Sequence, residues 1–242
     1  MVKQHVSASA ALCAKKTAPK KKTQDQCGQQ PLSLFDLPRE DNFFLERNLQ
    51  QQGYSVVAGL DEVGRGPLAG PVVAAAVVLP DTCHHARFID SKKLTAKKRQ
   101  EIFLYLHEIP CLIGIGIVSP KTIDKINILQ ASLLAMKRGV DQLSEHSTKP
   151  DFLLVDGKFP VPLITPQQPL IKGETRSASI AAASIVAKVT RDKIMAELHT
   201  QYPHYNFIKN QGYPTREHRN AIQQYGICPH HRLSYKGVKN LD

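Results

Sequence analysis

The sequence predicts an α/β protein in which a mixed β-sheet is flanked by helices. Short apolar runs such as VVAAAVV (72–78) are typical of strands buried on both faces. Longer segments in which apolar residues recur every three or four positions indicate helices packed on a sheet. The first two expected strands follow one another directly and the later ones alternate with helices, so both antiparallel and parallel pairs are expected.

The expected elements extend along the chain from residue 42 onward. Strands are expected at 54–60, 71–79, 111–119, 151–157 and 169–174. Helices are expected at 42–53, after the N-cap Thr95, from Ser119-Pro120, at 177–199 and at 215–226. The small residues of the fourth helix suit close packing against the sheet.

Composition and charge restrict the function. The chain has 242 residues, which is enough for one large domain or for one domain and a tail. Its formal net charge of +11 and its pI near 9.5 favour a polyanionic partner such as nucleic acid. No apolar stretch approaches the roughly 20 residues of a membrane span, so no membrane partner is expected. The five scattered cysteines, without a CxxC pair, favour reduced thiols in a cytoplasmic protein.

Residues 1–40 differ in composition from the rest of the chain. The run KKTAPKKK (15–22) and the polar residues after it show no periodicity, which predicts a disordered basic tail before a domain spanning 41–242. Within this tail, PLSLFDL (31–37) forms an apolar island. Either it packs on the domain as an irregular arm, or it docks into the groove of a partner protein.

Acidic residues stand at the ends of three expected strands. These residues are Asp61 with Glu62, Asp156 and Glu174. Because strand ends in an α/β sheet can converge, the four carboxylates are expected to cluster and to raise one another's pKa values. Oxygen ligands of this kind suit Mg²⁺ or Mn²⁺, which can activate water for phosphodiester cleavage. The alternative is that each acid caps a helix or pairs with a surface lysine.

The stretch after the first two acids is rich in glycine and proline. Gly64 and Gly66 have no Cβ, so the backbone N–H groups of this loop can approach a sugar–phosphate chain closely. Arg65 between them adds a forked donor for phosphate. The alternative is a plain connection between two strands, and the neighbouring acids favour the functional interpretation.

Six stretches of the chain resemble ribonuclease HII, the bacterial type 2 ribonuclease H. They are GLDEVGRGPLAGPVVAAAVVL (59–79), DSKKL (90–94), VDG (155–157), SIAAASIVAKVTRD (179–192), GYPTREH (212–218) and HHRLSY (230–235). The resemblance implies a ribonuclease H-like fold with a small C-terminal helical appendage. It also implies an endonuclease of ribonucleotide excision repair, which cuts the RNA strand of RNA–DNA hybrids and single ribonucleotides embedded in duplex DNA. The implied products carry 5′-phosphate and 3′-hydroxyl ends, and we expect the enzyme to be a monomer.

The resemblance implies metal-binding roles for the acids. Asp61, Glu62 and Asp156 match three of the family's four metal-binding carboxylates, which hold Mn²⁺ or Mg²⁺. Glu174 occupies the place of the fourth, normally the aspartate of a KGD stretch, so its extra methylene puts the metal preference or the rate in doubt. Asp192 is another acid that could substitute, but we expect it to be held along its helix by Arg191 or Lys188.

The resemblance also implies substrate contacts in three segments. The candidates are Gly64, Arg65, Gly66, Ser91, Lys92, Lys93 and Tyr213. The GRG loop (64–66) matches the family's reader of the 2′-hydroxyl, the feature that separates RNA from DNA. Tyr213 matches a tyrosine that stacks on the sugar after the ribonucleotide. The SKK segment (91–93) matches residues near the backbone phosphates, where lysines make binding salt-dependent.

The apolar island in the tail resembles the peptide by which bacterial DNA enzymes bind the β sliding clamp. In PLSLF (31–35), Leu34 and Phe35 would fill an apolar pocket and Leu32 would be a lesser anchor. The leading glutamine of that motif is replaced by Pro31. Partner binding through these residues is therefore a hypothesis of the sequence.

Two other functions remain open at this point. Ribonuclease HIII shares the fold and cleaves longer hybrids, but it usually carries a structured N-terminal domain, and residues 1–53 look too short and too polar for one. A hybrid-binding or DNA-binding protein whose nuclease has lapsed through Glu174 is the second alternative. An active enzyme would require Mg²⁺ or Mn²⁺ and would lose turnover but not binding with Asp61→Asn.

Overall fold

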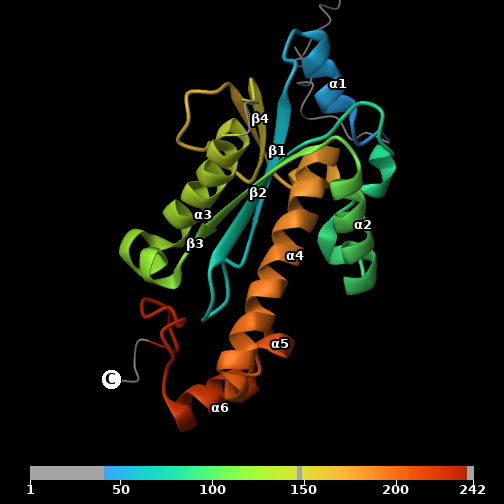
Figure 1. Cartoon of the computed structure of the whole chain (residues 1–242). Helices are drawn as coiled ribbons and strands as arrows, with labels where there is room; N and C mark the ends of the chain where they lie inside the picture. Colours follow the sequence, from blue (N-terminus) through green and yellow to red (C-terminus); the bar gives the residue numbers. More distant parts are fainter. Residues whose placement is uncertain (1–40, 146–148, 239–242) are drawn as a thin grey trace, which may run out of the picture. The chain divides into compact units, whose positions relative to one another are not determined.

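The computed structural model describes residues 41–145 and 149–238, which form a five-stranded sheet with helices (Figure 1). The strand order is β3-β2-β1-β4-β5. The strands are β1 (Val57–Val63), β2 (Val72–Val78), β3 (Leu112–Val118), β4 (Phe152–Asp156) and β5 (Gln167–Leu170). β2 is antiparallel to both β1 and β3, whereas β4 is parallel to β1 and β5. The predicted mixed sheet is confirmed.

Helices cover both faces of this sheet because β2 is apolar on both sides. Successive side chains of a strand point to opposite faces. Val73, Ala75 and Val77 therefore pack with α2 (Ala96–Glu108) and α4 (Ala178–Gln201), while Val72, Ala74 and Ala76 pack with α3 (Pro120–Glu145). Figure 1 shows α3 and α4 on opposite sides of the strands. No helix among the described residues is long and apolar enough to cross a membrane.

The predicted close packing of α4 on the sheet is confirmed. Residues 178–187 of α4 are all buried, and most of them are alanine or serine. A Cβ added at Gly59 in β1 would lie 2.2 Å from the backbone nitrogen of Ile180, so only glycine allows this approach. The backbones of β1 and α4 thus lie in direct contact beside the acids of β1.

Two strand boundaries differ from the prediction, and both involve the acids. β1 begins later than expected, because the carboxylate of Asp151 accepts the N–H groups of Ser55 and Val56 at 2.8 and 3.0 Å. It also continues to Val63 by pairing with β2, so its two acids lie inside the strand and not after it. β5 ends at Leu170, and Lys172 adopts a left-handed conformation (φ 56°) that ends the extended backbone.

The last helices form the small C-terminal appendage that was expected. They are α5 (Phe207–Asn210) and α6 (Arg216–Tyr225), and Figure 1 shows them near the end of α4. They pack with Tyr205, Met195 of α4 and Leu68 of the loop between β1 and β2 in a separate apolar core. At the other end, α1 (Phe44–Gln51) packs against β1 and β4. The loop between β1 and β2 is thereby held between the sheet and the appendage.

Candidate active site

The four acids that the sequence singled out come together where β1 and β4 run side by side. Leu60 of β1 pairs with Val155 of β4, which places Asp61 and Asp156 at the next position of these parallel strands. Glu62 follows in β1. Glu174 lies in the short 3₁₀ helix η4 (Gly173–Thr175), four residues beyond β5. We call these four residues the carboxylate cluster.

A hydrogen bond fixes η4 beside β4. The backbone N–H of Gly173 donates to Asp156 Oδ1 at 2.7 Å. A Cβ at Gly173 would lie 2.6 Å from Ile180 Cδ1 and 3.2 Å from that same Asp156 oxygen, so a larger residue here would displace the Ile180 side chain. The fourth acid therefore reaches the cluster through a turn that follows a strand, not through a strand end as the sequence suggested.

Burial and mutual repulsion raise the pKa values in the cluster. Asp61 is only 8% exposed, and burial followed by the charges of Glu62, Asp156 and Glu174 raises its pKa well above the usual value. Burial and the charge of Glu174 raise the pKa of Asp156 to about 6. Burial also raises the pKa of Glu62, and the charge of Arg65 offsets part of that rise. The cluster thus carries more negative charge than its surroundings neutralise.

Two exposed cations contact the rim of the cluster. Arg65 Nη1 lies 3.1 Å from Glu62 Oε1, and Lys92 Nζ lies 3.7 Å from Glu174 Oε1. Burial alone would lower the pKa of Lys92, but the charges of Glu174 and Asp61 raise it overall. Both cations are more than half exposed, so water screens these pairs and they stabilise little.

The cluster fits an oxygen-bound divalent cation by its chemistry and its charge. Glu174 Oε2 is buried and has no hydrogen-bond partner among the described residues. Carboxylate oxygens are the ligands that Mg²⁺ and Mn²⁺ prefer. In residues 41–145 and 149–238 no three acidic, histidine or cysteine side chains already stand close enough to hold an ion. At least three of the four carboxylates would have to move closer together to ligate one.

The GRG loop lies beside Tyr213. Gly64 has a positive φ of 92°, and a Cβ there would lie 2.2 Å from Arg191 Nε. A Cβ at Gly66 would be 3.5 Å from Tyr213 Cε1, and the tyrosine is 44% exposed. The N–H of Leu68 donates to the carbonyl of Gly212 at 2.7 Å, which joins the two segments. The GRG loop contacts the carboxylate cluster through the ion pair of Arg65.

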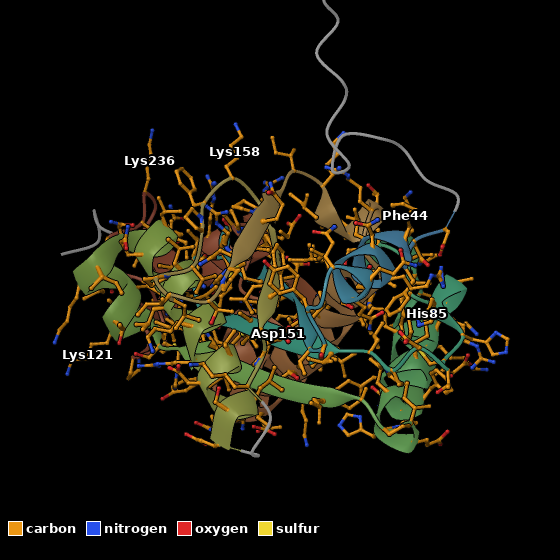
Figure 2. All side chains as sticks on the ribbon, turned by 90° about the horizontal axis from the view of Figure 1, so that it is seen from above. Phe44, His85, Lys121, Asp151, Lys158 and Lys236 are labelled. Carbon is orange, nitrogen blue, oxygen red and sulfur yellow. The ribbon has the colours of Figure 1, made fainter. Side chains whose placement is uncertain are left out.

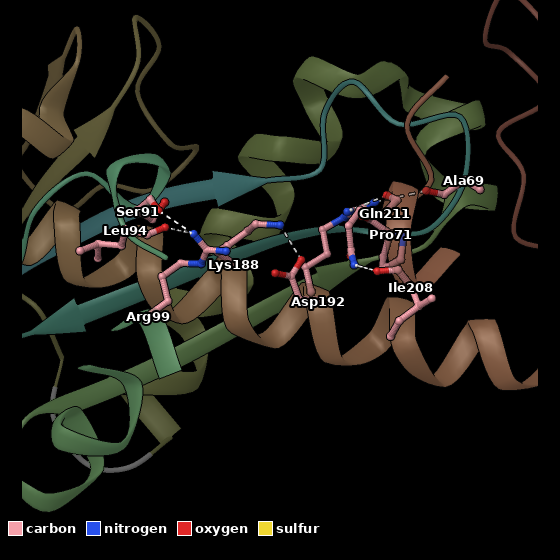
Figure 3. Close-up of polar contacts among 10 residues, drawn as sticks. Ala69, Pro71, Ser91, Leu94, Arg99, Lys188, Asp192, Ile208 and Gln211 are labelled. Atoms are coloured by element: carbon pink, nitrogen blue, oxygen red, sulfur yellow. Dashed lines mark hydrogen bonds and ion pairs between the residues drawn. The ribbon is translucent and has the colours of Figure 1, made fainter. Parts of the chain in front are cut away.

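The SKK segment is only partly exposed. Ser91 is 7% exposed, whereas Lys92 and Lys93 are exposed. Arg99 Nη1 donates to the carbonyls of Ser91 and Leu94, which holds the segment against α2 (Figure 3). The two lysines are therefore accessible to a ligand, whereas the serine is buried.

Asp192 is held by Lys188, one of the two partners expected for it. Lys188 Nζ donates to Asp192 Oδ1 at 2.5 Å within α4 (Figure 3). Arg191, the other expected partner, is fully buried and donates to backbone carbonyls. Elsewhere on the surface Lys121, Lys158 and Lys236 extend into solvent, so the positive charge is spread over several elements (Figure 2).

Four buried polar residues near the GRG loop were not predicted as site residues. They are Arg191, His218, His231 and Arg232, none of which is more than 2% exposed. The sequence held one signal for the first of them. Arg191 continues the i, i+4 spacing of Ala187 and Met195 along the apolar face of α4, and a cation in such a row is rarely buried without a purpose.

The chain was compared with known proteins. A family model described as "Ribonuclease HII" matches residues 58–238. The ribonuclease HII of Desulfotalea psychrophila (strain LSv54 / DSM 12343) is 62% identical over 206 residues, covering 85% of this chain and 91% of that protein.

Two solved structures have a similar fold. Ribonuclease H2 from Pyrococcus horikoshii OT3 aligns with a TM-score of 0.62 and 26% identity over 77% of this chain and 96% of that chain. The RNase HII of the PCNA:RNase HII complex from Archaeoglobus fulgidus aligns with a TM-score of 0.61 and 23% identity over 75% and 95%.

Proposed function

The chain belongs to the ribonuclease HII family and is therefore an endoribonuclease that hydrolyses RNA in RNA–DNA hybrids, and we propose that it also cuts at single ribonucleotides embedded in duplex DNA. The products of this cut carry 5′-phosphate and 3′-hydroxyl ends. The observation that carries the proposal is the position of the GRG loop, in which Gly66 lies beside Tyr213 and Arg65 pairs with Glu62 of the carboxylate cluster at 3.1 Å. A group that reads one ribose thus stands next to the acids. Because the chain belongs to this family, the alternative that it is a ribonuclease HIII is excluded.

Enzymes of this family depend on divalent metal ions, and we propose that the carboxylate cluster holds Mg²⁺ or Mn²⁺. When bound, such ions activate the attacking water and stabilise the leaving oxygen. The buried, unpartnered Oε2 of Glu174 and the burial-raised pKa of Asp61 support this assignment. A cation would relieve the repulsion that raises the pKa values of the cluster.

The chain's own groups position the substrate. The GRG loop approaches the ribose because Gly64 and Gly66 carry no side chain, and Arg65 contributes a forked donor to phosphate. Lys92 and Lys93 are exposed and contact neighbouring phosphates, and Tyr213 stacks on the following sugar. Ser91 completes the proposed set as a residue that supports the two lysines from inside.

Cleavage of a duplex that carries one ribonucleotide tests the proposal. Wild type, Asp61→Asn and Glu174→Asp are compared in Mg²⁺ and in Mn²⁺. We expect a cut on the 5′ side of the ribonucleotide by wild type, and binding without a cut by Asp61→Asn. Glu174→Asp reports how the longer side chain changes the rate or the metal preference. Intact binding without cleavage in either metal would support the lapsed nuclease instead.

A sliding clamp is the proposed protein partner. Leu32, Leu34 and Phe35 lie outside the described residues, so this proposal rests on the peptide PLSLF and on the sequence resemblance. The archaeal RNase HII whose fold is similar was solved in complex with PCNA, which supports the class of partner. If clamp capture by the full chain survives Leu34→Ala with Phe35→Ala, the peptide is not the docking site. A cytoplasmic monomer remains our expectation from the sequence.

A further inference from the structure

Two arginines lie buried beneath the GRG loop without an acidic partner. Arg191 in α4 and Arg232 near the C-terminal end are both 0% exposed. Their hydrogen-bond acceptors within the described part of the chain are backbone carbonyls and one tyrosine hydroxyl. A buried guanidinium normally has a carboxylate partner that cancels its charge. We call these two residues the arginine pair.

Arg232 binds the carbonyl groups of the GRG loop. Its Nη2 donates to the carbonyl of Gly64 at 2.6 Å, and its Nη1 donates to that of Arg65 at 2.9 Å. Nε and Nη2 donate to the carbonyl of Gly70, and Nη1 also donates to Tyr235 Oη. Tyr235 Oη in turn donates to the carbonyl of Arg65 at 2.7 Å. Every N–H of this guanidinium therefore has an acceptor.

These contacts determine which way the peptide groups of the loop face. In a trans peptide the carbonyl of one residue and the N–H of the next point in opposite directions. Because the carbonyls of Gly64 and Arg65 point inward to Arg232, the N–H groups of Arg65 and Gly66 point outward. Neither N–H has an acceptor within residues 41–145 and 149–238, and both residues are exposed. The two donors are thus available to a ligand.

Arg191 binds the later part of the loop between β1 and β2, beyond the GRG residues. Its Nε and Nη2 donate to the carbonyls of Pro71 and Ala69 at 3.0 and 3.2 Å (Figure 3). Its Nη1 donates to the carbonyl of Gln211, two residues before Tyr213. Burial and the charge of Arg232 lower the pKa of Arg191 to about 10, so it stays protonated at neutral pH. The arginine pair therefore leaves two positive charges that no carboxylate cancels behind the loop.

We propose that Arg232, with Arg191 beside it, is a positioning residue that holds the N–H donors of the GRG loop outward and adds positive charge behind them, so that the loop selects a ribonucleotide in an anionic backbone. This rests on the proposed function, in which the GRG loop reads the ribose. Backbone carbonyls satisfy the guanidinium groups without neutralising them, and that arrangement keeps the charge available to phosphate. Arg232 itself does not touch the substrate.

Binding by an enzyme that cannot cut tests the orienting role. All variants are made in the Asp61→Asn background, and the dissociation constants for a ribonucleotide-containing duplex and an all-DNA duplex are compared. Arg232→Lys keeps the charge but loses the fork that binds several carbonyls. We expect its preference for the ribonucleotide to fall about tenfold, which is the worth of one or two hydrogen bonds. Affinity for the all-DNA duplex should change less than about threefold, because the charge remains.

Arg232→Gln separates charge from orientation. It removes the charge, so we expect the all-DNA duplex to bind more weakly as well and the salt dependence of binding to become shallower. Arg138→Gln is the matched control, since Arg138 is an exposed arginine that donates to the carbonyl of Ile117 in β3. We expect this control to keep the full ribonucleotide preference.

These measurements distinguish the ribose-reading role of the GRG loop from the positioning role of Arg232. If the parent Asp61→Asn protein shows no ribonucleotide preference, the reading role of the GRG loop fails. If the parent has the preference and a folded Arg232→Lys protein keeps it, the positioning role of Arg232 is overturned. If the arginine variants do not fold, Tyr235→Phe is used instead, because it removes one of the two donors to the Arg65 carbonyl and also the hydroxyl that accepts from Arg232 Nη1. We expect this variant to lose part of the ribonucleotide preference, and an unchanged preference would overturn the orienting role of these contacts.

Discussion

The carboxylate cluster and the arginine pair are both groups of like charge in contact with the GRG loop; the two arginines are fully buried, whereas in the cluster Asp61 is buried and the other three acids are half-buried. In the cluster, burial and mutual repulsion raise the pKa of Asp61 and of Asp156, and Glu174 Oε2 has no partner among the described residues. In the arginine pair, backbone carbonyls accept from both guanidinium groups. The carboxylate cluster therefore keeps negative charge that its surroundings do not neutralise, whereas the hydrogen-bonding capacity of the arginine pair is used.

The difference shows what each group contributes. A buried charge is costly unless its hydrogen-bonding capacity is used and its field is balanced. The arginine pair meets the first condition through the main chain, so it acts as part of the fold. The cluster meets neither condition fully, which is typical of a functional site that binds a ligand of opposite charge. Substitutions should therefore separate the two: those in the cluster cost cleavage activity, whereas those in the arginine pair cost stability and, at Arg232, the preference for a ribonucleotide.

Asp61→Asn should have the largest effect on activity. We expect hybrid cleavage in Mg²⁺ to fall by about three orders of magnitude or more, because the proposed metal site would lose one charged ligand. The same change should raise the metal-free melting temperature by about 2–4 °C, since removing one buried like charge is worth roughly 1 kcal/mol. A cleavage assay and a thermal scan check both. Retained cleavage, or a lowered melting temperature, would contradict this account of the cluster.

Arg191→Met should have the largest effect on stability. It leaves the carbonyls of Ala69, Pro71 and Gln211 without their buried donor, and we expect a loss of about 3 kcal/mol. This corresponds to a melting temperature roughly 6–12 °C lower for a domain of this size. Urea unfolding at pH 7.5 measures it. A neutral result would mean that the carbonyls find other partners, and the arginine pair would then not be part of the fold.

A pair of histidines beside Tyr213 shows that buried polar groups can also be accommodated uncharged. His218 Nε2 and His231 Nε2 are 3.1 Å apart, His218 Nδ1 lies 2.9 Å from the carbonyl of Tyr213, and the N–H of Cys228 donates to His231 Nδ1 at 3.0 Å. Neutral rings satisfy this chain of contacts. Burial and the charge of His218 lower the pKa of His231 to about 4, and burial lowers the pKa of His218.

Acid should therefore destabilise the protein through His231. Its pKa is lower in the folded state than the usual 6.5, so the unfolded chain binds the proton more tightly. This contribution is complete above about pH 6.5 and is lost as the pH falls toward about 4, with a loss of about 2 kcal/mol at pH 5. The raised pKa of Asp156 acts in the opposite direction. The free energy of unfolding of wild type and of His231→Gln is measured in urea at several pH values. The difference between the two pH dependences is the contribution of His231.

The control for this measurement is His107→Gln, which removes an exposed imidazole from α2. We expect its stability to follow that of wild type between pH 7.5 and pH 5, because His231 is unchanged in this variant. If His231→Gln keeps the wild-type pH dependence, the histidine pair is not the cause of acid destabilisation.

Much of the fold was predictable, because strands and helices follow local patterns. The N-cap Thr95, the start of α3 at Pro120 and the small-residue face of α4 were all confirmed. The strand boundaries at β1 and β5 were wrong, since they depend on contacts that are distant in sequence, such as the carboxylate of Asp151 on the chain before β1.

The acidic side chains of the site were predictable from the sequence, but the buried residues that hold the neighbouring loop in place were not. Acids at strand ends and the resemblance to ribonuclease HII indicated the carboxylate cluster. The spacing along α4 indicated that Arg191 is buried, but the sequence does not show what Arg191 and Arg232 bind, because most of their acceptors lie in a loop more than a hundred residues away. The histidine pair joins His218 of α6 to His231 of the C-terminal segment, 13 residues further along the chain.

Asp192→Asn should have the smallest effect on cleavage and stability, and it tests whether Asp192 belongs to the metal-binding acids. Asp192 lies on α4 with its own partner, Lys188, and both side chains are partly exposed. We expect cleavage to stay within about twofold of wild type and stability to fall by about 0.3–0.5 kcal/mol, the worth of an i,i+4 ion pair. Cleavage assays in both metals and urea unfolding check this. A loss of activity comparable to that of Asp61→Asn would place Asp192 among the ligands, and Glu174 would then no longer be the proposed fourth acid.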